Sequence, residues 1–597
     1  MCYTCPMRKS LFGAALILAL LAAGCGNPLD SSREPDIFTS VADFLDRHDW
    51  NSSRNPIPLA VKLDSQEDWE RLLATLSYKN RYVSLDISDS TGMTVFNPDP
   101  SRAAGKAYIV NLKLPDSSTS IIEGTSDNPA FRFFSYLEKI EGTNIRRLGS
   151  YCFHNARSLE DAIFPSLIAI DDYAFSLCRN FTGTSVFETA TSIGDYAFMG
   201  CGFTGVALTD GITSIGNWTF AYCLELAEVV IPGSVTSIRD HAFRNCTGLE
   251  DIEIPRTVRS IGDYAFMDCT SLAGITLPDG ITRIGNYLFM NCTSLAGITI
   301  PGVVTFIGDS AFYRCSSLAA VTIPDSVTGI GEYAFMGCTS LAAVALPEKV
   351  GSIGNNAFRN CSGLADIAIP DSISWIGEYA FAGCTRLSSV HIPDTIVIIQ
   401  AGTFSDSGLT GIAIPNSVRS IGNSAFQRSN LTSVTIPAGV QNIGNYSFAD
   451  CMWLESAIIP NSVGSIGDYA FQGCGFSGIS IPETITALRT GVFRNSRLSA
   501  VTIPDSVTGI GARAFEGCRN LAAVTIPAGV TAIGDNAFAS CSALAGVTFD
   551  GTIGEEGFSS SGAFPGDLYE KYFETEGGPG SYATANPGNS AVWNRQP

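Results

Sequence analysis

Histidine, positive charge and long apolar runs are all scarce in this 597-residue sequence. It holds only four histidines, and charged residues make up 16% of it, with 36 Lys and Arg against 57 Asp and Glu. The net charge of -21 repels phosphate backbones, so we expect no nucleic-acid partner. The one apolar run that resembles a membrane segment, Leu11 to Ala23, is too short to span a bilayer as a stable helix.

Hydrophobic residues nevertheless make up 45% of the chain. Without long apolar runs, these residues must be spread along a long, thin core. A chain of this length would ordinarily divide into several domains, but a fixed internal period removes the size limit on one folded unit.

The first residues form an export signal. Arg8 and Lys9 precede the apolar run and small residues follow it, which predicts a secretory signal peptide over residues 1–24. The small residues before Cys25 resemble the bacterial lipobox, although Ala22 stands where Leu is commoner. That resemblance implies cleavage before Cys25 and diacylglyceryl attachment to it. Ordinary cleavage with Cys25 incidental is the alternative, and the sequence leaves open whether translation starts at Met1 or Met7.

One phenylalanine marks the register of a repeat through most of the chain. Its 18 copies are separated by 17 intervals, 11 of 23 residues and 6 of 22. The copies are Phe153, Phe175, Phe198, Phe220, Phe243, Phe266, Phe289, Phe312, Phe335, Phe358, Phe381, Phe404, Phe426, Phe448, Phe471, Phe493, Phe515 and Phe538. Such spacing predicts a solenoid in which each coil buries its apolar residues against its neighbours.

A single copy, residues 318–340, shows how a coil is built. The alternation around Thr322 predicts a half-buried strand, which ends before Pro324 because proline offers no hydrogen-bond donor. Ile330 is expected in the core, and Gly331 is expected to turn the chain with a positive φ. Phe335 is a large core residue, packed beside a small alanine.

These features resemble the BspA-like, or treponemal-type, leucine-rich repeats of bacterial surface proteins, over about residues 151–550. Leu318, Val321 and Ile323 match the strand of the commonest leucine-rich repeat, but no asparagine column follows. The resemblance implies a leucine-rich-repeat solenoid, an α/β-type repeat of short parallel strands with irregular turns and about 18 coils of 22–23 residues. It also implies an exported protein. Several family members act as adhesins for host matrix proteins or other cells.

The flanking segments predict caps. Residues 25–35 form a tether, residues 36–81 a small α+β N-terminal cap, and residues 82–150 degenerate first coils, so that the solenoid begins near Tyr82. In the cap, Ser65 is expected to begin a helix over Glu67 to Leu76, between strands at residues 56–63 and 82–87. Residues 551–597 are expected to hold a C-terminal cap, with a short helix from Asp567 to Phe573, and a loose tail after Gly577.

Fourteen copies carry a cysteine three residues after the phenylalanine. A ladder with one cysteine per coil lacks the convergence that metal sites need and the crossed geometry of disulfides. We therefore expect buried, reduced thiols that pack as small hydrophobes. They are Cys178, Cys201, Cys223, Cys246, Cys269, Cys292, Cys315, Cys338, Cys361, Cys384, Cys451, Cys474, Cys518 and Cys541, with Ala156, Ser407, Ser429 and Ser496 in the other coils.

Neither the histidines nor the acidic residues predict a reaction. His48, His154, His241 and His391 lie far apart and have no recurring Ser or Asp partner, so we expect no enzyme and no cofactor. Acidic residues follow the Ile-Gly pair as a stripe, for which solvated turns are favoured over a calcium-binding edge because Asn217, Asn286 and Asn355 interrupt the charge. The stripe consists of Asp195, Asp263, Asp309, Glu332, Glu378, Asp468 and Asp535.

The surface predicts binding without naming a ligand. The outward strand positions are small and uncharged, and the larger exposed candidates are expected in the turns: Trp218, Tyr264, Tyr333, Trp375, Tyr379 and Tyr446. The leading hypothesis is a lipid-anchored protein of the bacterial envelope that binds host matrix or cell-surface proteins, or other bacterial surface components. A periplasm-facing structural scaffold and a carbohydrate-binding solenoid are the alternatives.

Overall fold

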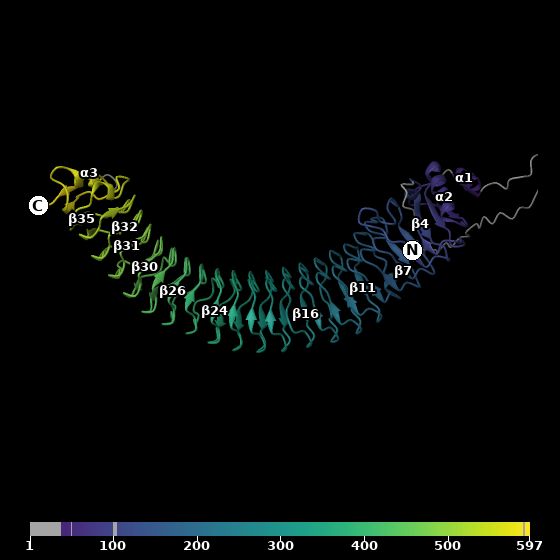
Figure 1. Cartoon of the computed structure of the whole chain (residues 1–597), viewed down its shortest axis with the longest axis horizontal. Helices are drawn as coiled ribbons and strands as arrows, with labels where there is room; N and C mark the ends of the chain where they lie inside the picture. Colours follow the sequence, from purple (N-terminus) through teal and green to yellow (C-terminus); the bar gives the residue numbers. More distant parts are fainter. Residues whose placement is uncertain (1–36, 49–50, 99–103, 589–590) are drawn as a thin grey trace, which may run out of the picture. The chain divides into compact units, whose positions relative to one another are not determined.

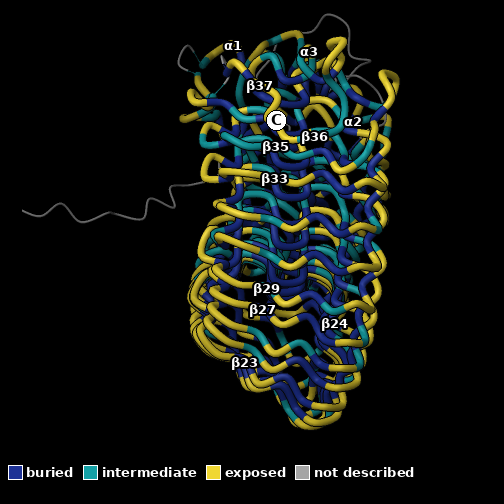
Figure 2. The backbone as a smooth tube through the Cα atoms, turned by 90° about the vertical axis from the view of Figure 1, so that its left-hand side faces the viewer, coloured by how far each residue is buried: buried dark blue, intermediate teal, exposed yellow. Residues whose placement is uncertain are grey.

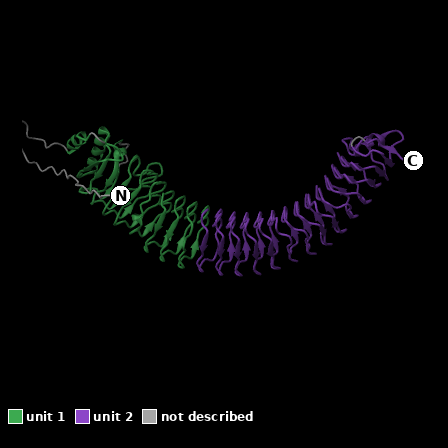
Figure 3. Ribbon diagram, turned by 180° about the vertical axis from the view of Figure 1, so that it is seen from behind, with its two compact units in different colours: residues 1–269 green, residues 270–597 purple. Residues whose placement is uncertain are grey.

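The computed structural model describes residues 37–48, 51–98, 104–588 and 591–597. The chain divides into two compact units, residues 1–269 and 270–597 (Figure 3). Stacked coils of short parallel strands make up most of each unit, while the α-helices lie in the end segments (Figure 1). They are α1 (Ile37–Asp46), α2 (Gln66–Lys79) and α3 (Leu568–Phe573), with short 3-10 turns η1 (Ala104–Tyr108), η2 (Ser185–Phe187) and η3 (Glu555–Gly557).

Most regular coils contribute two strands rather than the one that the sequence predicts. The first precedes the proline, and we call the sheets built from it the first-strand ladder. The second ends at the isoleucine before the glycine, and its sheets form the second-strand ladder. In the reference coil these strands are β19 (Ala320–Thr322) and β20 (Gly329–Ile330). The second strand is only two residues long, too short for its alternation to be recognised in the sequence.

In unit 1, both ladders are parallel. The first-strand ladder consists of β1 (Ile57–Ala60), β2 (Val83–Asp86), β4 (Ile109–Lys113), β6 (Lys139–Glu141) and β8 (Asp161–Ile163), then β11 (Gly205–Ala207) and β13 (Glu228–Val230). The second-strand ladder consists of β3 (Val95–Phe96), β5 (Ser120–Ile121), β7 (Arg147–Leu148), β9 (Ala169–Ile170) and β10 (Ser192–Ile193), then β12 (Ser214–Ile215), β14 (Ser237–Ile238) and β15 (Ser260–Ile261).

In unit 2, the first-strand ladder consists of β16 (Gly274–Thr276), β17 (Gly297–Thr299), β19, β21 (Ala343–Ala345) and β23 (Asp366–Ala368), then β27 (Ser433–Thr435) and β29 (Ser456–Ile458), then β33 (Ala523–Ile526) and β35 (Gly546–Phe549). The second-strand ladder consists of β18 (Phe306–Ile307), β20, β22 (Ser352–Ile353) and β24 (Trp375–Ile376), then β25 (Ile398–Ile399), β26 (Ser420–Ile421), β28 (Asn442–Ile443) and β30 (Ser465–Ile466), then β31 (Ala487–Leu488), β32 (Gly509–Ile510) and β34 (Ala532–Ile533).

The core consists of columns of equivalent side chains on the inside of the coils (Figure 2). Phe335 is fully buried, and its ring stacks on Phe312 and Phe358 with centroids 5.1 and 5.3 Å apart. Val321 and Ile330 are also buried, as the sequence predicts. The phenylalanine column begins earlier and ends later than its 18 regular copies, because the rings of Phe96, Phe131 and Phe564 stack on it. These additions bring the solenoid to about 21 coils.

The expected positive φ at Gly331 is wrong, because the left-handed residue is Tyr333, with φ 57°. A second left-handed residue, Gly337, follows Phe335 at φ 77°. Because left-handed residues stand on both sides of Phe335, the N–H groups of Tyr333, Phe335 and Gly337 all point to carbonyls of the next coil. Each of the three N–O distances is 2.8 Å. Gly331 is needed for a different reason: a Cβ there would lie 2.5 Å from Oδ1 of Asp309 in the preceding coil.

The helix predicted after Ser65 and the two strands that flank it are confirmed, and the first of these strands belongs to the solenoid sheet. Ser65 caps α2, its side chain accepting the N–H of Asp68 at 3.2 Å, and α2 buries Trp69. The strand β1 pairs in parallel with β2. The expected start of the coils near Tyr82 is therefore one strand too late, because α2 is the crossover of a β-α-β unit.

The C-terminal end is not the loose tail that its Gly, Ser and Asn content predicts. After α3, strand β36 (Gly580–Ala583) pairs antiparallel with β35, and β37 (Asn594–Arg595) pairs antiparallel with β36. Trp593 is fully buried, and its indole N–H donates to the carbonyl of Pro565 at 2.8 Å. The tail is ordered because it pairs with the last parallel strand, whose open edge would otherwise expose unpaired backbone groups.

Candidate protein-binding surface

The outward face of the first-strand ladder is a strip of small side chains, as the sequence predicts. In unit 2 its exposed positions include Thr276, Thr299, Thr322, Ala345, Ala368, Thr435 and Thr525. Small side chains of this kind lack the large anchors that dominate protein-binding energy. The strip is broken by Ile458, which pairs with Thr435 and is 63% exposed, a residue that the sequence analysis missed although it departs visibly from the column.

Large apolar side chains gather on the second-strand ladder of unit 2. Trp375, expected in a turn, instead lies on β24 and is 47% exposed. In the next coil Val397 and Ile398 are 51% and 44% exposed, and Ile398 occupies the position equivalent to Trp375. We call these three residues the Trp375 cluster. Equivalent positions in most other coils of this ladder hold small residues such as Ser352 and Ser420, although Phe306 on β18 is also large and is 43% exposed.

A second exposed apolar pair lies farther along unit 2. Met452 and Trp453, at the corner after Cys451, are 58% and 57% exposed. Both residue types are enriched at protein interfaces. The pair lies in the coil whose first strand carries the exposed Ile458, so the three residues form a second apolar group, which we call the Trp453 group.

Most of the aromatic residues expected on the turns stack on or pack against the turns of neighbouring coils. In unit 1 six half-buried rings stack in sequence with centroids 4.0–5.7 Å apart: Tyr151, Tyr173, Tyr196, Trp218, His241 and Tyr264. In unit 2 the ring of Tyr379 lies against Gly402 of the next coil. Tyr333 and Tyr446 are more exposed, and Tyr446 stacks on Tyr469 at 4.9 Å. These positions are left-handed in every coil, so the rings stabilise a strained turn.

The acidic stripe after the Ile-Gly pair has a structural role. Oδ1 of Asp309 accepts the backbone N–H of Glu332 in the next coil at 2.8 Å, and Oδ1 of Asn355 accepts that of Glu378 at 2.9 Å. Asp and Asn alternate in this column because both offer the same acceptor oxygen. The geometry accounts for these residues as turn caps, which favours the structural interpretation over a calcium-binding edge. Among the residues that the structure describes, no group of three or more His, Cys, Asp or Glu could hold a metal ion.

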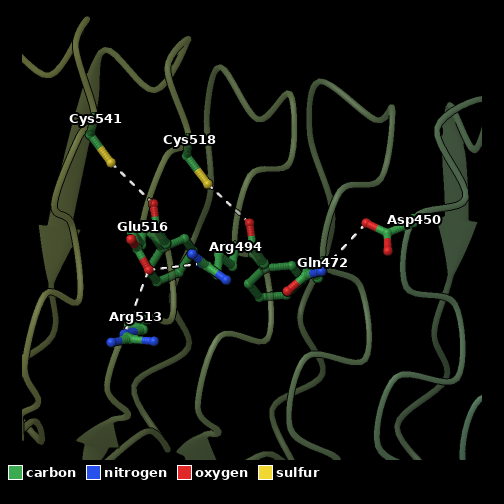
Figure 4. A network of polar contacts seen from close by, with 9 residues as sticks. Asp450, Gln472, Arg494, Arg513, Glu516, Cys518 and Cys541 are labelled. Atoms are coloured by element: carbon green, nitrogen blue, oxygen red, sulfur yellow. Dashed lines mark hydrogen bonds and ion pairs between the residues drawn. The ribbon is translucent and has the colours of Figure 1, made fainter.

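The cysteine column is buried and reduced, as predicted, with 15 free buried thiols among the described residues. The ladder thiols also make a contact that a hydrophobe could not: Cys361, for example, donates to the carbonyl of Phe335 at 3.1 Å. Figure 4 shows the same contact from Cys518 and Cys541, beside the ion pair of Arg494 and Glu516 at 2.8 Å. Burial raises the pKa of the Cys361 thiol to about 12, which keeps it protonated and unreactive.

The comparison with protein families agrees with this coil geometry. The model of the BspA type leucine rich repeat region, six copies long, matches residues 104–227, 214–342, 328–455 and 441–563. Together these matches cover well over half of the chain. The chain belongs to the BspA-type leucine-rich-repeat family.

Solved structures of leucine-rich-repeat proteins are also similar. A protein from Bacteroides ovatus ATCC 8483 is 28% identical, with 57% of this chain and 83% of that chain covered and a TM-score of 0.49. A leucine rich cell surface protein from Faecalibacterium prausnitzii A2-165 is 25% identical, with coverage of 58% and 86% and a TM-score of 0.35. The T. pallidum leucine rich repeat protein is 26% identical, with coverage of 34% and 78% and a TM-score of 0.24. No curated protein matches the chain.

The four histidines occupy unrelated places in this BspA-type solenoid. His48 packs on Phe44 at the end of α1, and His241 is one ring of the aromatic stack in unit 1. His391 is exposed and lies 3.3 Å from the carboxylate of Asp371, in unit 2. His154 is half-buried in unit 1, and burial lowers its pKa. The fold therefore places each histidine in its own local setting.

The expected lipid site is not part of the described structure. Cys25, the signal peptide over residues 1–24 and the tether over residues 25–35 all lie outside the described residues. Within the described part of the chain, no helix is long and apolar enough to cross a membrane.

Proposed function

We propose that this BspA-type protein is a non-enzymatic, protein-binding solenoid of the bacterial surface. A solenoid of this family is typically a binding scaffold rather than a catalyst. The observation that carries the proposal is the Trp375 cluster. It provides a tryptophan and two aliphatic side chains in successive coils, where the equivalent positions of most other coils hold small residues such as Ser352. Tryptophan is among the residues that contribute most to binding energy at interfaces.

The proposal also includes a location for the protein in the cell. The basic residues, short apolar run and small residues before Cys25 favour export and lipid attachment, which would hold the solenoid at the cell envelope. The partners would then be host matrix or cell-surface proteins, or other bacterial surface components. A periplasm-facing scaffold would carry the same lipid anchor but would not be exposed on the outside of the cell. Protease treatment of intact cells distinguishes the two, because a surface protein is cleaved and a periplasmic one is protected.

The binding role is tested by surface plasmon resonance of the full chain against a panel of purified extracellular-matrix proteins. We expect the double variant W375S/I398S, which introduces the serine found in neighbouring coils, to lose about 2 kcal/mol of binding free energy or more, roughly 30-fold in Kd. The variant V230S is the matched control, because Val230 is an equally exposed apolar strand residue of unit 1.

A second double variant, W453S/I458S, separates the two apolar groups of unit 2. If it removes binding while W375S/I398S does not, the Trp453 group is the interface and the Trp375 cluster is not. Loss in neither variant, with binding intact, would reject both the Trp375 cluster and the Trp453 group as the interface. A glycan array run beside the protein panel tests the carbohydrate-binding alternative.

A further inference from the structure

A pocket of about 560 Å³ opens in unit 1 between two successive coils, those of Phe131 and Phe153. Its volume lies within the range of small-molecule sites, about 300–1,000 Å³. One wall is the loop between β5 and β6, and the other is the turn after Phe153. Among the residues that line it are Asp127, Arg132, Phe133, His154 and Arg157.

The pocket is basic in a strongly acidic protein. Nη1 of Arg132 donates to the backbone carbonyl of Asp127 at 2.7 Å and to Oδ1 of Asn128 at 3.5 Å, and Nε of Arg157 donates to Oδ1 of Asn155 at 3.0 Å. Neither guanidinium forms an ion pair with any carboxylate in the described part of the chain, although the protein carries a net charge of -21. Two uncompensated guanidinium groups at one opening attract an anion and can bind it through paired hydrogen bonds.

Phe133 adds an apolar surface at the same opening. Its side chain is 42% exposed, and its backbone is left-handed with φ 73°, in the position that holds Asn155 in the next coil. A phenylalanine in this conformation is strained, and its ring is only partly buried to offset that strain. The guanidinium of Arg132 lies over the ring, 4.7 Å from its centroid. The ring therefore holds one arginine of the pocket and leaves apolar area beside it.

His154 supplies an unused polar atom in the same wall. Its Nδ1 is buried and has no hydrogen-bond partner, while its ring contacts Tyr151 edge-on at 5.6 Å. A neutral imidazole can accept a hydrogen bond from a hydroxyl or donate one to an oxygen, depending on its tautomer. Buried polar atoms without partners are rare in proteins, and each one calls for an explanation such as an ordered water or ion.

We propose that this pocket binds the acidic residue of a saccharide, a uronate or a sulfated sugar, with its anionic group on Arg132 and Arg157 and its ring against Phe133. The anionic group binds the two guanidiniums, neither of which forms an ion pair within the described part of the chain. The apolar face of the sugar ring covers Phe133, and its hydroxyls find the polar wall that includes Ser126, Ser135 and His154. A pocket of this size suits one or two sugar rings, whereas an acidic peptide would need an extended groove. The site lies in unit 1 and is independent of the Trp375 cluster in unit 2.

The test is isothermal titration calorimetry of the full chain with three probes: a sulfated, uronate-containing disaccharide, its neutral counterpart, and inorganic sulfate. We expect binding of the acidic disaccharide and at least tenfold weaker binding of the other two. The double variant R132Q/R157Q should weaken the acidic disaccharide at least tenfold. The variant R179Q is the matched control, because Arg179 is an exposed arginine in the following coil that does not line the pocket.

A further variant, F133G, removes the ring at a position whose positive φ suits glycine, so the fold is preserved. We expect it to weaken the disaccharide but to leave sulfate binding unchanged. Absence of binding by every acidic saccharide, or equal affinity for the disaccharide in R132Q/R157Q and wild type, would overturn the proposal. Equal affinity for sulfate and disaccharide would overturn the saccharide assignment. An acidic peptide serves as a fourth probe, and its binding in preference to the disaccharide would overturn the saccharide assignment too.

Discussion

The thiol of Cys361 donates a hydrogen bond to the backbone carbonyl of Phe335 in the preceding coil, with 3.1 Å between Sγ and O. The same carbonyl already accepts the N–H of Cys338 within its own coil at 3.1 Å. One oxygen thus joins the turn of one coil to the next. Cysteine suits this column because it is small enough for the core and still has a weak donor for the second lone pair.

We predict that the ladder thiols are protected in the native protein. Because they are buried and burial raises their pKa, they should react slowly with a thiol reagent near neutral pH. In denaturant the protein should titrate the 14 ladder thiols together with Cys152. Mass spectrometry of unreduced protein provides the check, and finding most of these cysteines in disulfides would refute the prediction.

We predict that stability falls at alkaline pH. The folded pKa of Cys361, about 12, lies above the ordinary value of 9.0, so the folded state keeps its proton at a pH where the unfolded chain loses it. Stability is therefore full below about pH 9 and is lost as the pH rises toward 12. C361S should reduce this loss by up to about 1.4 kcal/mol per pH unit, measured in urea melts at about pH 8 and pH 10.5. Equal pH slopes for wild type and variant would contradict the assignment.

We predict that the core column and the outward strip differ sharply in their effect on stability. F335A removes a fully buried ring and should cost about 3–5 kcal/mol, whereas T322A changes an exposed strand residue and should have little effect. Because a coil contacts only its neighbours, F335A should split unfolding into separable segments. Denaturant melts followed by circular dichroism provide the measurement, and equal damage by both variants would mean that the faces are wrongly assigned.

We predict that the acidic stripe depends on an acceptor oxygen rather than on charge. D309N keeps the oxygen that accepts the N–H of Glu332 and should leave stability nearly unchanged. D309A removes the acceptor and should cost about 1 kcal/mol. Thermal melts with and without calcium provide the check. A calcium-dependent stabilisation of wild type that D309N abolishes would favour the calcium-binding interpretation instead.

We predict that C25A prevents acylation and releases the protein from membranes. The small residues before Cys25 resemble a lipobox, and the thiol is the atom to which the lipid would be attached. Partitioning between detergent and aqueous phases measures the outcome, with a conservative signal-peptide variant such as A15V as control. An unchanged detergent-phase fraction for C25A would show that Cys25 is incidental to the anchor.

Several features could be predicted from the sequence because they depend on local patterns. The spacing of the phenylalanines determines the coil period, since every coil must present its ring at the same core position. The helix after Ser65 follows from its capping residue and apolar spacing. The cysteine ladder follows from its fixed offset from the phenylalanine. In each case a short stretch of chain carries the whole signal.

Other features were decided by contacts between residues 22 or 23 positions apart, which local patterns do not report. The positive φ lies at Tyr333 rather than at Gly331, because the turn directs its N–H groups at the next coil, while Gly331 only makes room for Asp309. Trp375 lies on a strand because its backbone pairs with Ser352 of the preceding coil.

The sequence by itself therefore determined the repeat, its register and the residues of the core, because hydrophobic spacing reports which side chains must be buried. The stacking of coils decided the rest. It determined where the backbone is strained, which strand β36 pairs with, and which large side chains, such as Trp375, remain exposed, since each depends on the neighbouring coil. The pocket beside Arg132 and Arg157 is of this second kind, because its walls come from two coils that become neighbours only when the solenoid forms.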